Sequence, residues 1–148
     1  MKKQVVSFML LLITVGFMSG VVHAQTSYGV KANVPFDFYV GDQAFRASAI
    51  TVRRMSSFDG VLLISSADNG PRQIRLTNNL QSTSRSNEAK LVFHKYGNRY
   101  YLAQVWTDGS SGRELLKSRG ERALQREMRL VAKNASEPKM VTIIASMQ

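Results

Sequence analysis

The stretch KLVFHKYGNRYYLAQVWT, from Lys90 to Thr107, decides the fold that the sequence predicts. Two runs rich in Val, Phe, Tyr and Trp flank Gly97-Asn98, and two residues that tolerate positive φ between such runs are a strong hairpin signal. A two-residue loop also fixes the expected register of the ladder. The expected pairs are Tyr96 with Arg99, Lys95 with Tyr100, Phe93 with Leu102, and Leu91 with Gln104.

The two faces of this hairpin differ in polarity, because side chains alternate along a strand. The predicted core face holds Leu91, Phe93, Tyr100, Leu102 and Trp106. The second face is mixed and holds Val92, His94, Tyr96, Tyr101, Ala103 and Val105. A sheet face that is half apolar usually has another element resting on it, and the segment after Thr107 is the candidate cover.

Further strands are predicted on both sides of the hairpin. Alternation of apolar and polar residues, or a short apolar run between turn signals, marks each of them. They cover residues 30–40, 50–53, 61–65, 72–77 and 139–147. In the fourth of these, Ile74 and Leu76 are expected to point inward.

One helix is expected directly behind the hairpin. Ser111 and Glu114 have the spacing of a capping box, so the helix is expected to begin there. Its predicted apolar side consists of Leu116, Gly120, Ala123, Leu124, Met128, Leu130 and Val131. Five cations at steps of three and four residues form a ridge nearly opposite: Arg119, Arg122, Arg126, Arg129 and Lys133.

These elements predict a β-rich fold, a small antiparallel β-sandwich or open barrel of about 6–8 strands with one amphipathic helix in its C-terminal half and a final strand. Residues 1–24 have the basic start, apolar run and small-residue end of a secretory signal peptide. Residues 25–148 then form a single domain that is exported to the periplasm or the extracellular space. No stretch of this mature chain is apolar enough for a transmembrane span.

The whole chain has a net charge of +10 and contains no cysteine. No disulfide and no thiol chemistry is therefore available to it. A basic exported domain meets anionic surfaces readily, and a lipid headgroup or an acidic polysaccharide is the expected class of partner. Another envelope protein is the further possibility. A nucleic acid is not expected as a physiological partner.

A family resemblance covers most of the mature chain. The segments VKANVPFDFYVGDQAF, LLISS, KLVFHKYGNRYYLAQVW and GRELLKSRGERALQRE together resemble a group of small exported proteins common in acidobacterial genomes. None of these segments is a catalytic motif. The resemblance implies export, and it implies no activity.

The search for catalytic residues in the mature chain finds no constellation. His94 is the only histidine after the leader, and neither a nucleophile with an orienting acid nor a set of metal ligands stands at a suitable spacing. A packed, hydrogen-bonded role in the sheet is therefore the expectation for His94. Together with Tyr96, Arg99 and Tyr101 it is kept as a possible ligand contact. No enzyme activity, metal or cofactor is expected.

Two functions remain open at this point. The first is a non-enzymatic binding or structural module of the bacterial envelope, with the basic ridge from Arg119 to Lys133 as a candidate anion-binding surface. Against it stands the simpler interpretation of the ridge as a solvated helix face. The second is a small periplasmic β-barrel that carries an apolar or amphipathic ligand in an internal cavity.

Overall fold

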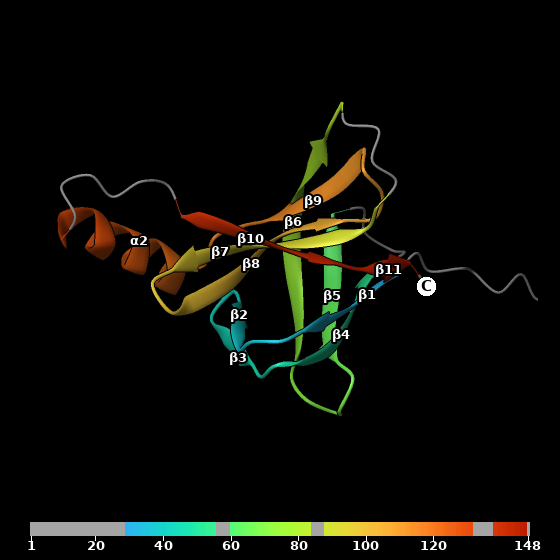
Figure 1. Ribbon diagram of the computed structural model, residues 1–148, viewed down its shortest axis with the longest axis horizontal. Coiled ribbons are helices and arrows are strands. Elements are labelled where there is room, and N and C mark those ends of the chain that lie inside the picture. Colours follow the sequence, from blue (N-terminus) through green and yellow to red (C-terminus); the bar gives the residue numbers. More distant parts are fainter. Residues whose placement is uncertain (1–28, 56–59, 84–87, 132–137, 148) are drawn as a thin grey trace, which may run out of the picture.

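The computed structural model describes residues 29–55, 60–83, 88–131 and 138–147 (Figure 1). Strands dominate this part of the chain, and α2 (Arg119–Val131) is the helix that it contains. The strands are β1 (Gly29–Val34), β2 (Phe38–Val40), β3 (Gln43–Phe45), β4 (Ser48–Arg54), β5 (Val61–Ser66), β6 (Arg72–Gln81), β7 (Lys90–Tyr96), β8 (Arg99–Trp106), β9 (Ser111–Leu115), β10 (Lys139–Ile144) and β11 (Ser146–Met147).

The strands form one bent sheet that does not close. Its order is β10-β7-β8-β9-β6-β5-β4-β1-β11, with β2 and β3 attached through β8. The long strand β6 lets the sheet fold over, because its first half pairs with β5 and its second half with β9. The sheet has 11 strands, more than the 6–8 expected, but the β-rich class with one helix is confirmed.

The last segment of the chain lies at both ends of this sheet. β10 pairs with β7 at one end, and β11 pairs with β1 at the other. Only Ala145 separates β10 from β11, so the two ends of the sheet must lie close together, and β1 and β10 are indeed in contact. The C-terminal strands therefore span the opening of the sheet (Figure 1).

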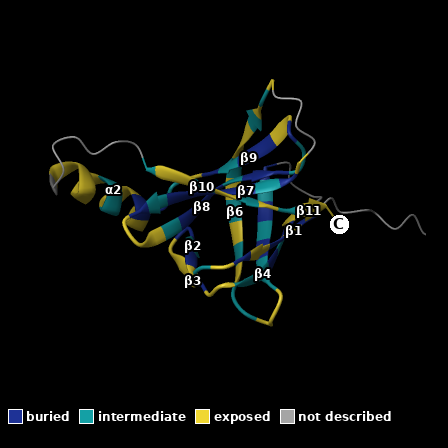
Figure 2. Ribbon diagram, viewed as in Figure 1, coloured by how far each residue is buried: buried dark blue, intermediate teal, exposed yellow. Residues whose placement is uncertain are grey.

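The core lies between the two halves of the bent sheet (Figure 2). Phe93 is at its centre, fully buried, with its ring 5.3 Å from that of Phe36 and 5.4 Å from that of Phe38, both edge-on. Edge-to-face pairs at such distances add to the stabilisation that burial of the rings provides. Ile50 and Ile64 from the opposite half are buried in the same cluster.

The central hairpin has the predicted turn but contains a bulge. Phe93 pairs with Leu102, whereas Val92 pairs with Gln104, so β8 has one extra residue at Ala103. Because one inserted residue reverses the faces beyond it, the predicted pair of Leu91 with Gln104 is wrong. Leu91 pairs with Val105 instead.

Trp106 was expected on the core face, and the bulge turns it to the other one. Val105 takes the place of Trp106 in the core cluster. The indole instead packs against Gly112, where an added Cβ would lie 2.6 Å from a ring atom. Its Nε1 donates a hydrogen bond of 3.0 Å to the amide oxygen of Gln104, and the ammonium of Lys90 lies 5.4 Å from the ring centroid.

The orientation expected for β6 is also wrong. Ile74 and Leu76 are 57% and 65% exposed, and they pair with the half-buried Leu63 and Val61 on the outer face of the sheet. Alternation alone does not say which set of side chains faces inward, and the pairing with β5 decides it. Arg75 points to the inner side instead, where its Nη2 donates a hydrogen bond of 2.7 Å to the carbonyl oxygen of Leu116.

The helix begins later than the sequence predicts. Residues 111–115 form β9, which pairs with both β6 and β8, so the pairing of this segment on both sides prevails over its local capping signal. The N-cap is Ser118, whose Oγ accepts a hydrogen bond of 3.1 Å from the backbone N–H of Glu121. The predicted apolar side is wrong as well, because Leu130 is 85% exposed and Glu121 is buried.

Candidate functional site

The first turn of α2 is fastened to the sheet from two directions. The carboxylate of Asp42, in the turn between β2 and β3, accepts a hydrogen bond of 3.1 Å from the backbone N–H of Gly120. An added Cβ at Gly120 would lie 2.6 Å from that same carboxylate, so a larger residue there would displace the Asp42 side chain. A carboxylate at a helix N-terminus is also favoured by the helix dipole. The start of the helix is thus held at a fixed point.

Glu121 provides the second attachment and is only 4% exposed. Its Oε1 lies 2.9 Å from Nδ1 of His94 and accepts a hydrogen bond of 3.2 Å from the hydroxyl of Tyr96. Because a carboxylate can only accept, the Nδ1 of His94 is the protonated nitrogen. Burial, and then the negative charge of Glu121, raise the pKa of Tyr96 above its ordinary value. The cluster joins α2 to the second face of the hairpin, as the mixed polarity of that face predicts.

The predicted ligand contacts lie in and around this cluster. His94, Tyr96 and Tyr101 are buried, and burial is the main reason that the pKa of Tyr101 is raised. The ring of Tyr101 stacks on that of Tyr39, with centroids 5.1 Å apart. Arg99 is exposed beside the hairpin turn. The polar atoms of His94 and Tyr96 therefore face Glu121, which gives them a role in holding the helix.

The C-terminal part of α2 extends away from the sheet (Figure 1). Every residue from Arg126 to Leu130 is exposed, and the distal turns show no buried residue in Figure 2. A helix that covered the sheet would bury one side along its whole length. Among the described residues, those from 126 to 130 are thus exposed to solvent.

Four of the five residues of the basic ridge lie on the described part of α2. Arg119, Arg122, Arg126 and Arg129 are all exposed, and Lys133 lies outside the described residues. In the part of the chain that the structure describes, no carboxylate forms an ion pair with these arginines. Nε of Arg126 donates a hydrogen bond of 3.3 Å to the carbonyl oxygen of Arg122, and the positive charge of Arg129 acts on the hydroxyl of Tyr96. The described part of the basic ridge thus consists of four arginines. Like charges at this spacing repel each other mildly.

Leu130 adds an apolar group to this exposed surface. At 100° per residue, it lies 40° from Arg126 on the helix circumference, and therefore on the solvent side. The buried or half-buried positions Glu121, Leu124 and Gln125 are on the opposite side. Leu130 is 85% exposed, so this side of the helix presents an apolar side chain next to arginines.

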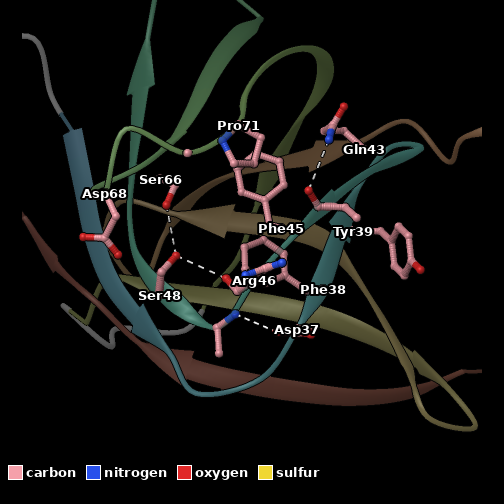
Figure 3. A pocket seen from close by; sticks show the side chains of 13 residues that line it. Asp37, Phe38, Tyr39, Gln43, Phe45, Arg46, Ser48, Ser66, Asp68 and Pro71 are labelled. Atoms are coloured by element: carbon pink, nitrogen blue, oxygen red, sulfur yellow. Dashed lines mark hydrogen bonds between the residues drawn. The ribbon is translucent and has the colours of Figure 1, made fainter.

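A pocket of about 730 Å³ lies at the other side of the β2–β3 hairpin (Figure 3). Its walls are the hairpin, the start of β4 and the turn between β5 and β6. The lining residues are Asp37, Phe38, Tyr39, Gln43, Ala44, Phe45, Arg46, Ala47, Ser48, Ser66, Asp68, Gly70 and Pro71. Phe38 and Phe45 are buried at its base, and polar groups surround them.

Sequence reasoning missed Glu121 and this pocket. The spacing of Ser118 and Glu121 is itself that of a capping box, and this is the signal in the sequence that indicates Glu121. The pocket had no comparable signal, because Asp37 and Asp68 come from distant segments and look scattered along the chain.

Comparison with protein-family models, curated proteins and solved structures finds no match to this chain. Within the described residues, no group of His, Cys, Asp and Glu side chains is arranged to hold a metal ion. None of the helices in the same part of the chain has the length and hydropathy needed to cross a membrane.

Proposed function

We propose that the protein is a non-enzymatic binding module that attaches to an anionic envelope surface through the exposed part of α2. The observation that supports this is the overhang, by which we mean residues 126–130 of α2: they are exposed, and no carboxylate among the described residues forms an ion pair with their arginines. A contact with an anionic surface would offset the mutual repulsion of the ridge.

The surface proposed is that of lipid headgroups rather than acidic polysaccharide. Basic amphipathic helices bind lipid interfaces by placing apolar side chains below the headgroups while cations contact the phosphates. Leu130, 85% exposed on the solvent side, could enter such an interface, and the ridge beside it would contact the anions. A polysaccharide would use the arginines but gain little from Leu130.

The rigid attachment of the helix start supports the same proposal. Asp42 and Glu121 hold the first turn of α2, so the distal turns point in a defined direction from the sheet. Presenting a preordered helix avoids the entropy cost that a disordered segment would meet on binding.

The experiment measures co-sedimentation of the protein with anionic and neutral vesicles, and its retention on acidic polysaccharide, over a salt series. Each arginine near an anionic membrane contributes about 1 kcal/mol, so the triple variant Arg122→Gln, Arg126→Gln, Arg129→Gln should bind about 100-fold more weakly. The matched control removes the same charge from the exposed Arg53, Arg54 and Arg72.

The expected result is vesicle binding that fades as salt rises and that the control triple largely retains. Equal loss in both triples would show that net charge alone is responsible and would refute a site on α2. Leu130→Ser should weaken binding to vesicles and leave retention on polysaccharide unchanged. Equal binding to both materials that ignores Leu130 would transfer the proposal to polysaccharide.

A further inference from the structure

Strand β3 has an open edge. Among the described residues it pairs with β2 alone, through Phe38 with Phe45, Tyr39 with Ala44, and Val40 with Gln43. Around a two-residue turn the first pair exchanges hydrogen bonds, and pairs then alternate between bonded and non-bonded. The backbone N–H and C=O of Ala44 therefore point away from β2, toward the open edge.

This open edge forms one wall of the pocket. The five consecutive residues from Gln43 to Ala47 all line it, and the turn between β5 and β6 forms the facing wall with Asp68, Gly70 and Pro71 (Figure 3). The volume of about 730 Å³ is in the range of pockets that hold small ligands. An extended chain segment placed here would lie beside an unpaired strand.

The polar groups near the edge are held in place but leave capacity for a ligand. The Nε2 of Gln43 donates a hydrogen bond of 3.2 Å to the carbonyl oxygen of Ala44, and Oδ1 of Asp37 accepts one of 2.8 Å from the backbone N–H of Ala47. The first of these comes from an exposed, flexible side chain that a ligand can displace. The second fixes the end of the edge.

The lining of the pocket also contains charged side chains of both signs. The carboxylate of Asp68 and the guanidinium of Arg46 have no hydrogen bond or ion pair to another described side chain, and they do not pair with each other. In Figure 3, Asp68 lies at one end of the pocket, beyond Ser48 and Ser66. Both residues line the same pocket, and side chains of opposite charge there suit a ligand with an ammonium and a carboxylate.

We propose that this pocket binds a short peptide as an added strand on β3, with main-chain hydrogen bonds to Ala44 and the peptide's N-terminal ammonium at Asp68. Addition of a strand to an open edge is an established mode of peptide recognition. The guanidinium of Arg46 would contact the C-terminal carboxylate. The edge of β3 is only three residues long, so it offers few bonds and favours a short ligand with charged termini over a long strand.

The test uses tetraalanine with free termini as the probe and NMR of the ¹⁵N-labelled protein as the readout. We expect shifts at the amides of residues 43–47 and a dissociation constant of about 1 mM or lower. N-acetylated tetraalanine should bind about tenfold more weakly, because it lacks the ammonium. Tetraalanine with alternate amides methylated should also bind at least tenfold more weakly, because it cannot complete the ladder.

A double-mutant cycle assigns the ammonium to its partner. In Asp68→Asn, free and acetylated tetraalanine should bind equally. Asp68 is exposed, so the variant should fold, and the dispersion of the NMR spectrum checks this. The control Asp108→Asn, far from the pocket, should keep the tenfold difference. Binding of anionic vesicles should be unchanged in Asp68→Asn, so this test is separate from that of the function proposed for α2.

Three results would overturn the proposal. No shift at residues 43–47 with about 20 mM tetraalanine would show that the pocket does not take a peptide. Equal binding of the methylated and unmethylated probes would exclude strand addition. Concentration-dependent dimerisation that protects the amide of Ala44 would assign the edge to a second copy of the chain.

Discussion

Replacement of Glu121 by alanine should cost more stability than any other single change in α2. Glu121 is the common acceptor for two buried donors, Nδ1 of His94 and the hydroxyl of Tyr96, at 2.9 and 3.2 Å. Its removal leaves both donors inside the protein without this partner. The helix would also lose its attachment to the hairpin.

The magnitude follows from the cost of an unpaired buried group. Each such donor costs about 1–3 kcal/mol, so the two together cost about 2–6 kcal/mol of the free energy of unfolding. Domains of this size have about 5–15 kcal/mol in total, so the change should be plain in a urea titration. Glu121→Gln should lose less, because the amide oxygen can still accept one hydrogen bond.

The matched control is Glu127→Ala, on the same helix and exposed. This variant also removes one glutamate from α2, so it changes the charge of the helix by the same amount. Its free energy of unfolding should change by no more than about 0.5 kcal/mol. The midpoint and slope of the urea transition are measured for all three variants. If Glu121→Ala and Glu127→Ala had the same free energy of unfolding, the cluster would not hold the helix and the reasoning would be refuted.

Three further predictions concern the core, the bulge and alkaline pH. Phe93→Ala should lower the free energy of unfolding by about 3–5 kcal/mol, measured in urea, because the ring is fully buried; a loss below 1 kcal/mol would contradict its central place. Gly112→Ala should cost about 1–3 kcal/mol through overpacking against Trp106, and Trp106→Leu should relieve part of it. Folding raises the pKa of Tyr96, so the stability that Tyr96 contributes is complete below the unfolded pKa of about 10 and is lost as pH rises from there toward the folded pKa. In thermal melts, the melting temperature of Tyr96→Phe should therefore fall less steeply at alkaline pH than that of the unchanged protein. An equally steep fall in both would exclude Tyr96 as the cause.

The sequence predicts most clearly where local chemistry decides the structure. The turn at Gly97-Asn98 forms as expected, and Gly97 has a positive φ of 59°. The register next to the turn follows from the loop length. Further from the turn, the bulge at Ala103 moves Trp106 to the other face. The local sequence pattern does not predict a bulge of one residue.

Tertiary pairing explains the other differences. Residues 111–115 have a capping signal but gain two strand neighbours, β6 and β8, which an isolated helix could not match. Ile74 and Leu76 alternate correctly, yet the pairing with β5 puts them outside. Both outcomes depend on segments distant in sequence, as does the pocket between the β2–β3 hairpin and the turn at Asp68.

The sequence indicates which arginines lie together on α2, but it does not indicate that this part of the helix extends away from the sheet. The arginine spacing identifies the ridge, whereas the overhang depends on where the helix begins and where Glu121 attaches it. The exposure of Leu130 beside the arginines therefore follows from the attachment of the first turn.

The most direct measurement places a fluorescent label at the proposed contact. The chain has no cysteine, so Leu130→Cys gives a single attachment site for an environment-sensitive dye, and Ile74→Cys provides an exposed control on the outer face of the sheet. We predict that anionic vesicles shift the emission of the label at position 130 to the blue, that salt reverses the shift, and that the label at position 74 does not respond. An unchanged spectrum at position 130 under conditions where the protein sediments with vesicles would contradict the account.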